Sequence, residues 1–321
     1  MVIFMITFDF FNDSKEELLN KISQHFQLDS DSLTDFFINE NATVLNLIDT
    51  FNINLSAHKS SNVSLICRHL TTTNNTELSS FRKHGILNLK EMLQKETPLS
   101  LFLAEHDISI DYDAKTINIY GVNYPILESC TECDKCLIGK ETVCSKYSYC
   151  KLKQNLINLS SKLYYFKATV EFFLVGDIDE MLRYPCISRY PEILYTIENL
   201  AHSADNTKKC WLGLDWMNSH NKVIMLEFPT LLSNLETLTI SKDPHEYYNH
   251  HLLFESCDYN YSDFMDSRIP QSFFDNYTLI EKFISAYYNY PNIYGSLLAN
   301  DSVNPDCIKF YEVIDNQIFE I

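Results

Sequence analysis

Apolar residues near the start of the chain recur every three or four positions, which is the spacing of an amphipathic helix. Ser14 and Glu17 are spaced as a capping box, and the apolar positions that follow them keep this period as far as Phe26. We therefore predict a helical N-terminal element over residues 1–60. Two further helices are expected within it, at 29–37 and 43–51.

The middle of the chain mixes strand patterns with helix patterns. Alternating or continuous runs of β-branched and aromatic residues predict strands at 63–70, 108–112, 116–120, 163–166, 168–175, 191–197, 210–214 and 223–228. Helical spacing predicts helices at 75–84, 89–93, 98–106 and 155–163. We expect Thr71–Thr73 to form a turn, and Gly85 to end the first of these helices as a left-handed C′ residue.

The order of these elements predicts an α+β fold. Strands and helices do not alternate regularly over 61–235, so a core with a mixed sheet is favoured over a doubly wound parallel sheet. Residues 236–321 are mainly helical and acidic, and they close with two short strands at 308–314 and 317–321. The expected organisation is a mixed-sheet core between helical N- and C-terminal flanks.

Five of the ten cysteines fall close together: Cys130, Cys133, Cys136, Cys144 and Cys150. Thiolates at such spacing bind one tetrahedral zinc ion together, and four of them close a structural site. We therefore predict a zinc module at 126–152, inserted in the core. The spacing leaves open which four of the five bind the metal. Because four thiolates leave no open coordination position, catalytic chemistry has to come from other residues.

Composition narrows the class and the location of the protein. Of the 321 residues, 45% are hydrophobic, but only six are glycine, and the chain has neither a dinucleotide-binding fingerprint nor a P-loop. The apolar run at 1–12 is short and contains Asp9, so it predicts a buried strand and not a signal peptide. No run reaches the roughly 18 apolar residues of a membrane span. These features predict a cytoplasmic protein with reduced thiols; an oxidised secreted protein is the alternative.

The net charge of −18 is unevenly distributed along the chain. Residues 135–170 carry seven lysines and one acid, a net charge of +6, whereas residues 243–321 carry thirteen acids and three bases, a net charge of −10. A local lysine-rich face binds a phosphate backbone even when the whole chain repels it. Nucleic acid is therefore a candidate partner of the segment 135–167, and an ordinary solvated surface is the simpler interpretation.

Two segments carry residue types with chemical function. Residues 68–71, Arg-His-Leu-Thr, end a predicted strand. Glu192 opens another predicted strand, and a carboxylate among apolar residues needs a partner or a function, because an uncompensated buried charge is costly. Each residue also has a structural interpretation, His69 as a core histidine and Glu192 as the partner of Arg189 or Lys167.

In this order the segments resemble the motifs of ADP-ribosyltransferases, above all the DarT-type toxins that modify nucleic acid. His69-x-Thr71, followed by a helix and Gly85-Ile86, is similar to the opening motif of that family. Tyr164-Tyr165-Phe166 is similar to its tyrosine-bearing strand, and Pro191-Glu192 to its late strand with the catalytic glutamate. The resemblance covers roughly residues 61–200. The cysteine insert departs from these toxins and leaves the substrate open.

The resemblance implies an enzyme that consumes NAD and transfers ADP-ribose to a macromolecule. It implies that His69 hydrogen-bonds the ribose of NAD and that Thr71 holds the nicotinamide end. Tyr165, or Tyr164 in its place, is expected to stack on the nicotinamide ring.

The same resemblance assigns the charged groups. Glu192 is expected to stabilise the positive charge that develops at the anomeric carbon, as carboxylates do in glycosyl transfer. Arg68 or Arg82 is expected to pair with the pyrophosphate. Because such activity harms its host cell, the resemblance implies a toxin or a phage-defence effector.

Two other classes of protein remain open. One is a non-enzymatic, zinc-stabilised binding protein that contacts nucleic acid or a partner protein through its lysines. The other is a hydrolase or nuclease with a catalytic metal. Salt-dependent nucleic-acid affinity without NAD binding favours the first, and activity that chelation abolishes without unfolding the chain favours the second.

Overall fold

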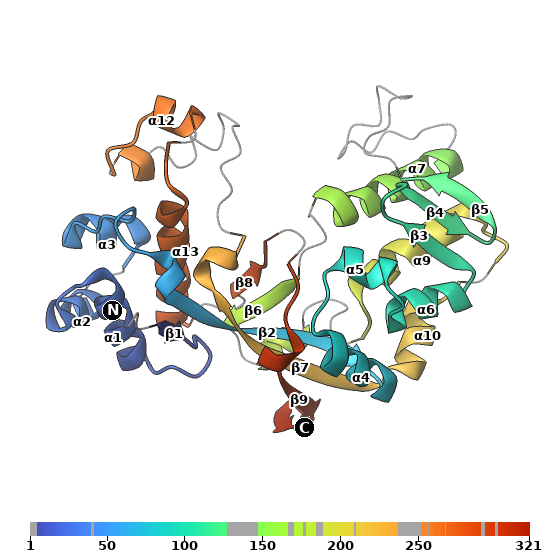
Figure 1. The fold of residues 1–321 in the computed structure, drawn as a ribbon, viewed down its shortest axis with the longest axis horizontal. Helices are drawn as coiled ribbons and strands as arrows, with labels where there is room; N and C mark the ends of the chain where they lie inside the picture. Colours follow the sequence, from blue (N-terminus) through green and yellow to red (C-terminus); the bar gives the residue numbers. More distant parts are fainter. Residues whose placement is uncertain are drawn as a thin grey trace. The chain divides into compact units, whose positions relative to one another are not determined.

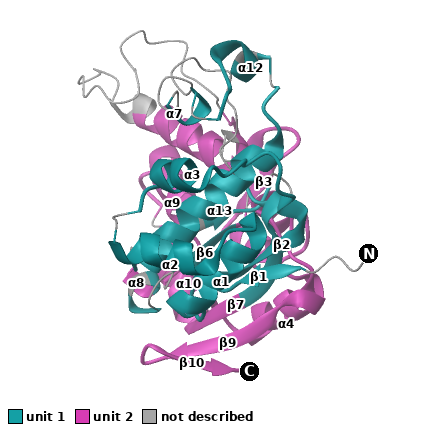
Figure 2. Ribbon diagram, turned by 90° about the vertical axis from the view of Figure 1, so that its left-hand side faces the viewer, with its two compact units in different colours: residues 1–69, 171–181, 227–298 teal, residues 70–170, 182–226, 299–321 magenta. Residues whose placement is uncertain are grey.

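The computed structural model describes residues 5–39, 42–126, 147–165, 170–175, 178–183, 189–208, 210–236, 252–255, 257–266, 268–289, 293–298 and 301–321. In these ranges the chain has a mixed α+β fold, which confirms the predicted fold class at this level. The chain forms two compact units, each built from three segments (Figure 2). The first unit comprises 1–69, 171–181 and 227–298, and the second comprises 70–170, 182–226 and 299–321.

The helices of the first unit include α1 (Lys15–Phe26), α2 (Ser30–Asn39), α3 (Val44–Phe51), α12 (Tyr261–Met265), α13 (Gln271–Tyr287) and the larger part of α8 (Ile178–Arg183). The capping box at Ser14 and Glu17 starts α1 as predicted, and α2 and α3 confirm the next two predicted helices. The apolar faces of α1, α2 and α3 pack on α13, beside which they lie in Figure 1. One such contact joins the rings of Phe37 and Phe283, whose centroids are 5.2 Å apart.

The strands that belong to the first unit in whole or in part are β1 (Ile6–Phe8), β2 (Val63–Thr73), β6 (Glu171–Val175), β7 (Lys222–Leu231) and β8 (Ile293–Ser296). Strand β1 runs parallel to the start of β2, with Ile6 opposite Val63. Strand β6 is antiparallel to both β2 and β8, and it places Phe173 opposite Arg68.

The sheet that contains β2 has the strand order β10-β9-β7-β2-β6-β8, with β1 beside β2. Its last two strands in the chain, β9 (Lys309–Ile314) and β10 (Gln317–Glu320), form the predicted C-terminal hairpin. Residues of β2 and of β7 belong to both units. Most of β2 is buried on both of its faces, so the few polar side chains that it carries need partners within the fold.

The second unit has its own core under a small antiparallel sheet, formed by β3 (Ile108–Asp111), β4 (Thr116–Ile119) and β5 (Val122–Pro125). The helices that contribute apolar residues to this core are α5 (Leu89–Gln94), α6 (Pro98–Glu105), α7 (Tyr147–Ser160), α9 (Glu192–Ala204) and α10 (Leu212–Ser219). The strands predicted at 108–112 and 116–120 and the helices predicted at 89–93 and 98–106 are confirmed. The largest fully buried side chain of this core is Trp216.

Helix α4 (Asn75–His84) follows β2 and ends at Gly85, as predicted. The backbone φ of Gly85 is 75°, which a residue with a side chain rarely adopts, but its ψ of −159° lies outside the left-handed helical region that was predicted. A Cβ atom at this position would lie 1.8 Å from the carbonyl oxygen of Val303. The next residue, Ile86, pairs with Val303 in an isolated antiparallel bridge. Gly85 therefore allows the C-terminal segment to lie directly against the end of α4.

Three predicted strands and one predicted turn are wrong. Residues 192–204 form α9 and residues 212–219 form α10, because their apolar positions follow a helical period over a longer window than the predicted strands. Residues 161–165 form a single π-helical turn at the end of α7. The Thr71–Thr73 segment continues β2 and forms no turn.

The described residues contain no helix that has both the length and the hydropathy to cross a membrane.

Candidate functional site

Strand β2 carries three of the residues singled out by sequence: Arg68, His69 and Thr71. Side chains alternate along a strand, so His69 and Thr71 point to one face and Arg68 to the other. Arg68 is only 1% exposed, whereas His69 and Thr71 are partly exposed. The strand thus presents a buried cation on one side and an imidazole–hydroxyl pair on the other.

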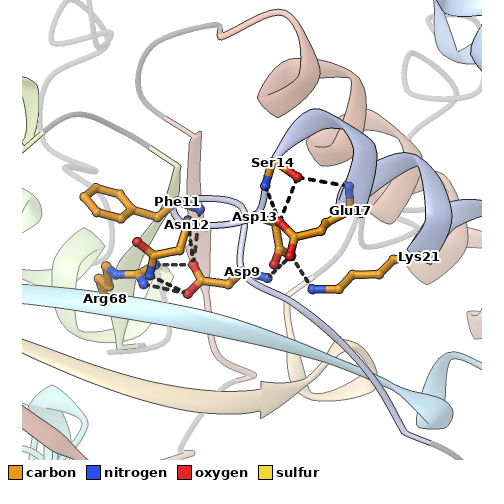
Figure 3. Close-up of polar contacts among 8 residues, drawn as sticks. All are labelled: Asp9, Phe11, Asn12, Asp13, Ser14, Glu17, Lys21 and Arg68. Atoms are coloured by element: carbon orange, nitrogen blue, oxygen red, sulfur yellow. Dashed lines mark hydrogen bonds and ion pairs between the residues drawn. The ribbon is translucent and has the colours of Figure 1, made fainter.

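Arg68 lies in a buried ion cluster with two carboxylates of the first unit. Its Nη1 and Nη2 donate to the two carboxylate oxygens of Asp9 at 2.9 and 3.0 Å, and Nη2 also donates to Glu227 Oε2 at 2.7 Å. Figure 3 shows the Asp9 arm of this cluster, with the ring of Phe11 4.5 Å from the guanidinium carbon. A guanidinium held by two carboxylates at this burial is not available to a pyrophosphate, so Arg68 does not fit the role that the resemblance implied for it.

The turn after β1 holds the Asp9 carboxylate in place. Asp9 Oδ1 accepts from the backbone amides of Phe11 and Asn12, and Oδ2 accepts from the side-chain amide of Asn12 (Figure 3). Burial raises the pKa of Asp9, but the hydrogen bonds and charge of Arg68 and the donors of the turn more than offset it, so the pKa lies below its usual value. The cluster is a preorganised, ionised structural element.

His69 is fixed in one tautomer by the neighbouring strand. Its Nδ1 lies 2.8 Å from the backbone oxygen of Glu171, and a carbonyl only accepts, so Nδ1 carries the proton. Burial lowers the pKa of His69, although this hydrogen bond raises it in part. The ring is therefore neutral near pH 7, and its Nε2 is a hydrogen-bond acceptor.

The two predicted stacking residues lie in the π-helical turn and not on a strand. Tyr164 donates to the backbone oxygen of Tyr112 at 2.7 Å, and the two rings lie 4.8 Å apart. Tyr112 in turn donates to the backbone oxygen of Leu163 at 3.1 Å. Tyr164 is thus engaged in a packed pair of tyrosines. Tyr165 belongs to the same turn, and its side chain lies outside the described residues.

Glu192 is the first residue of α9, which corrects the predicted strand around it. Pro191 precedes it with a φ of −56° and a ψ of 130°, which lie outside the helical region, and apolar residues then recur at helical spacing. The Glu192 carboxylate is 54% exposed and accepts from Lys162 Nζ at 2.7 Å. Of the two predicted partners, Lys167 lies outside the described residues, and no ion pair with Arg189 is found in the described part of the chain. The predicted pair of His69 and Glu192 is divided between the two units.

The remaining candidates are Arg82 and the clustered cysteines. Arg82 is exposed on α4, where its guanidinium lies 5.5 Å from the ring centroid of Phe310. Cys130, Cys133, Cys136 and Cys144 lie outside the described residues, as does the side chain of Cys150. Elsewhere in the described ranges, no three side chains of His, Cys, Asp or Glu gather as a metal site.

Sequence inspection missed a buried acid–base pair in the second unit. Glu77 of α4 and His220 after α10 are both buried, and their nearest nitrogen and oxygen, His220 Nε2 and Glu77 Oε2, are 3.8 Å apart. Burial raises the pKa of Glu77 to about 8, and Thr73 lowers it in part. Asn74 caps α4, because its side-chain oxygen accepts from the backbone amide of Glu77.

Trp216 links this pair to the end of β2. Its indole stacks on His220 at 3.6 Å with an interplanar angle of 4°, and its Nε1 donates to Thr72 Oγ1 at 2.9 Å. His220 Nδ1 lies 2.9 Å from Ser219 Oγ, which can donate or accept, and 3.2 Å from the backbone oxygen of Trp216. Burial lowers the pKa of His220, which keeps the ring neutral. A protonated Glu77 therefore faces a neutral imidazole.

Comparisons of the chain with protein-family models, with curated proteins and with solved structures find no match.

Proposed function

We propose that the chain is an NAD-dependent enzyme that transfers ADP-ribose to a macromolecular acceptor, either nucleic acid or protein. The observation that carries the proposal is the β2–α4 segment: His69 and Thr71 on one face of a strand, a capped helix directly after it, and Gly85 with positive φ at its end. This is the arrangement that the resemblance to ADP-ribosyltransferases assigns to His-x-Thr, helix and glycine.

The tautomer of His69 supports the role proposed for it. Because Nδ1 donates to the backbone of β6, Nε2 is left as an acceptor, which suits a ribose hydroxyl as donor. Thr71 lies two positions further on the same strand face, where its hydroxyl suits the carboxamide of nicotinamide. Of the two arginines proposed for the pyrophosphate, Arg82 is the exposed one, and we assign this role to it.

Glu192 is the acid that the resemblance assigns to the reacting carbon. Cleavage of the nicotinamide–ribose bond passes through an oxocarbenium-like state, and a carboxylate stabilises its positive charge. The exposed position of Glu192 at the start of α9 leaves its carboxylate accessible to substrate. The resemblance implies a strand at this position, whereas Glu192 lies at the start of a helix. Replacement of Glu192 is therefore the most informative test of the proposal.

The activity test combines calorimetry with NAD and label transfer from NAD to a mixture of RNA, DNA and protein, with release of nicotinamide measured in parallel. Glu192→Gln should lower label transfer at least ~100-fold while NAD still binds. His69→Gln and Thr71→Val should weaken NAD binding about tenfold or more. His84→Gln, at an exposed position of α4, is the matched control and should match the unchanged chain.

Three outcomes would count against the proposal in different ways. Unchanged turnover in Glu192→Gln would remove this carboxylate from the mechanism. Absence of NAD binding, together with salt-dependent affinity for nucleic acid, would replace the enzyme with a lysine-rich binding protein. Release of nicotinamide without label transfer would limit the activity to NAD hydrolysis.

A further inference from the structure

A polar cavity of about 320 Å³ opens in the first unit, at the C-terminal end of α1. Six of the residues that line it are polar: Gln24, His25, Gln27, His58, Lys59 and Asn62. None of the described lining residues is an acid or a cysteine. A cavity of this size with two imidazoles in its wall is a candidate ligand site.

Hydrogen bonds fix the tautomer of His25. Asn276 is fully buried, and its Nδ2 donates to the backbone oxygens of Leu55 and His58 at 2.7 and 2.9 Å. The amide orientation is thereby set, and Asn276 Oδ1, 2.7 Å from His25 Nε2, has to accept. His25 therefore carries its proton on Nε2, and in the neutral ring Nδ1 holds a lone pair.

The ring of His58 lies against the backbone of His25. Burial, the larger effect, lowers the pKa of His58, and the contact with His25 raises it in part. Burial also lowers the pKa of His25, so both rings are neutral near pH 7, and each neutral ring has one nitrogen with a lone pair. His25, which donates its Nε2–H to the amide oxygen of Asn276, shows the hydrogen-bond pattern typical of metal-ligating histidines.

The separation of the two rings suits a shared ion. Their centroids are 5.6 Å apart, and Phe26 packs edge-on against both, at 4.6 and 5.0 Å. Two imidazoles on one ion with metal–nitrogen bonds of about 2.0–2.1 Å have their ring centroids roughly 5–6 Å apart. The contacts with Phe26 and Asn276 restrict ring rotation, so little ordering is needed on binding.

We infer that His25 and His58 bind one divalent transition-metal ion in this cavity, with water or a small anion beside Lys59 in the remaining coordination positions. Imidazole ligands select zinc, nickel, cobalt or copper over magnesium and calcium, which need oxygen ligands. With two protein ligands the site is open, unlike a four-cysteine site. The inference is independent of the proposed transfer of ADP-ribose.

Cobalt(II) distinguishes this site from the cysteine cluster, because thiolate ligands give an intense charge-transfer absorption and imidazole ligands do not. The full chain is titrated with Co²⁺ by calorimetry and absorption. His58→Gln and His25→Gln should each lose one bound equivalent, or weaken its binding at least ~10-fold, without changing the thiolate signal. His84→Gln, a histidine of the other unit, should bind as the unchanged chain does.

His25 is buried, so its variant is first checked for folding by circular dichroism. His58 is only partly buried. If His25→Gln does not fold, metal binding by His58→Gln alone tests the inference. Equal stoichiometry and affinity in His58→Gln and in the unchanged chain would overturn the inference. Loss of the thiolate signal together with the imidazole-bound equivalent would also overturn it, since both would then belong to one site.

Discussion

Each compact unit contains a buried cluster with an acidic side chain, around Arg68 in the first unit and around Glu77 in the second, and these two clusters are stabilised in opposite ways. In the first unit, Asp9, Arg68 and Glu227 are joined by three hydrogen bonds between opposite charges. In the second unit, Glu77 faces a neutral His220 at 3.8 Å, and its Oε2 has no hydrogen-bond partner in the described structure. Burial alone therefore does not decide the charge of an acid in this protein.

The pKa shifts of Asp9 and Glu77 give the reason why the two clusters differ in charge. Arg68, in direct contact with Asp9, lowers the pKa of this carboxyl although it is buried. For Glu77, the hydrogen bond with Thr73 offsets only part of the effect of burial, so the pKa rises to about 8. The first cluster keeps its charges and depends on all its members. The second avoids the cost of a buried charge by keeping a proton.

Removal of the cation should have the largest effect. Arg68→Met leaves Asp9 and Glu227 buried without their partner, and we expect it to lower the free energy of unfolding by about 3–5 kcal/mol. Urea titration measures this value. Arg82→Met, which removes only an exposed cation–π contact, should cost about 1 kcal/mol or less. A loss in Arg68→Met no larger than in this control would show that the cluster is not needed for the fold.

Replacement of the protonated acid should change the pH dependence of stability. Between pH 4.5 and about 8, Glu77 binds a proton in the folded chain and has lost it in the unfolded chain, so stability falls as pH rises through this window. Glu77→Gln removes this dependence. Its free energy of unfolding relative to the unchanged chain should therefore rise by up to about 1.4 kcal/mol per pH unit from pH 6 to 8.

The matched control for this comparison is the exposed Glu105→Gln on α6. Urea titrations at several pH values should give a control curve parallel to that of the unchanged chain. If the Glu77→Gln curve is parallel as well, Glu77 is ionised in the folded chain, and the contrast between the two clusters disappears.

The smallest effect is expected at the surface. Lys162 and Glu192 are 28% and 54% exposed, so solvent screens their attraction, and a double-mutant cycle of Lys162→Met and Glu192→Gln should give a coupling of about 0–1 kcal/mol. A loss of ADP-ribose transfer in Glu192→Gln would then reflect chemistry and not folding. A coupling well above this range would place the pair among the structural clusters.

Local signals in the sequence predicted much of the fold. The capping box at Ser14 and the glycine at the end of α4 act over a few residues, and both are found where they were predicted. The strand predicted at 191–197 failed because its short apolar run also fits the first turns of a helix. Only the longer window, which includes Leu200 and Ala201, shows the helical period of α9.

The candidate site was harder to predict because its contacts are distant in the sequence. Arg68 binds Glu227 across 159 positions, and His25 meets Asn276 across 251. No spacing rule links such residues, so the ion cluster and the two-histidine cavity became visible only in the fold. Conversely, the motif at His69 and Thr71 was local, and it is the part of the site prediction that the fold leaves intact as a proposal.

The interleaving of the two units has a consequence for the synthesis of the protein. Residues 1–69 belong to a unit that also contains residues 227–298, so the first unit cannot fold completely before that later segment has been synthesised. Ile86 pairs with Val303, whose carbonyl oxygen lies against Gly85, so the second unit also depends on a segment made much later. Until these segments have been synthesised, nascent β2 is exposed to chaperones or to neighbouring chains.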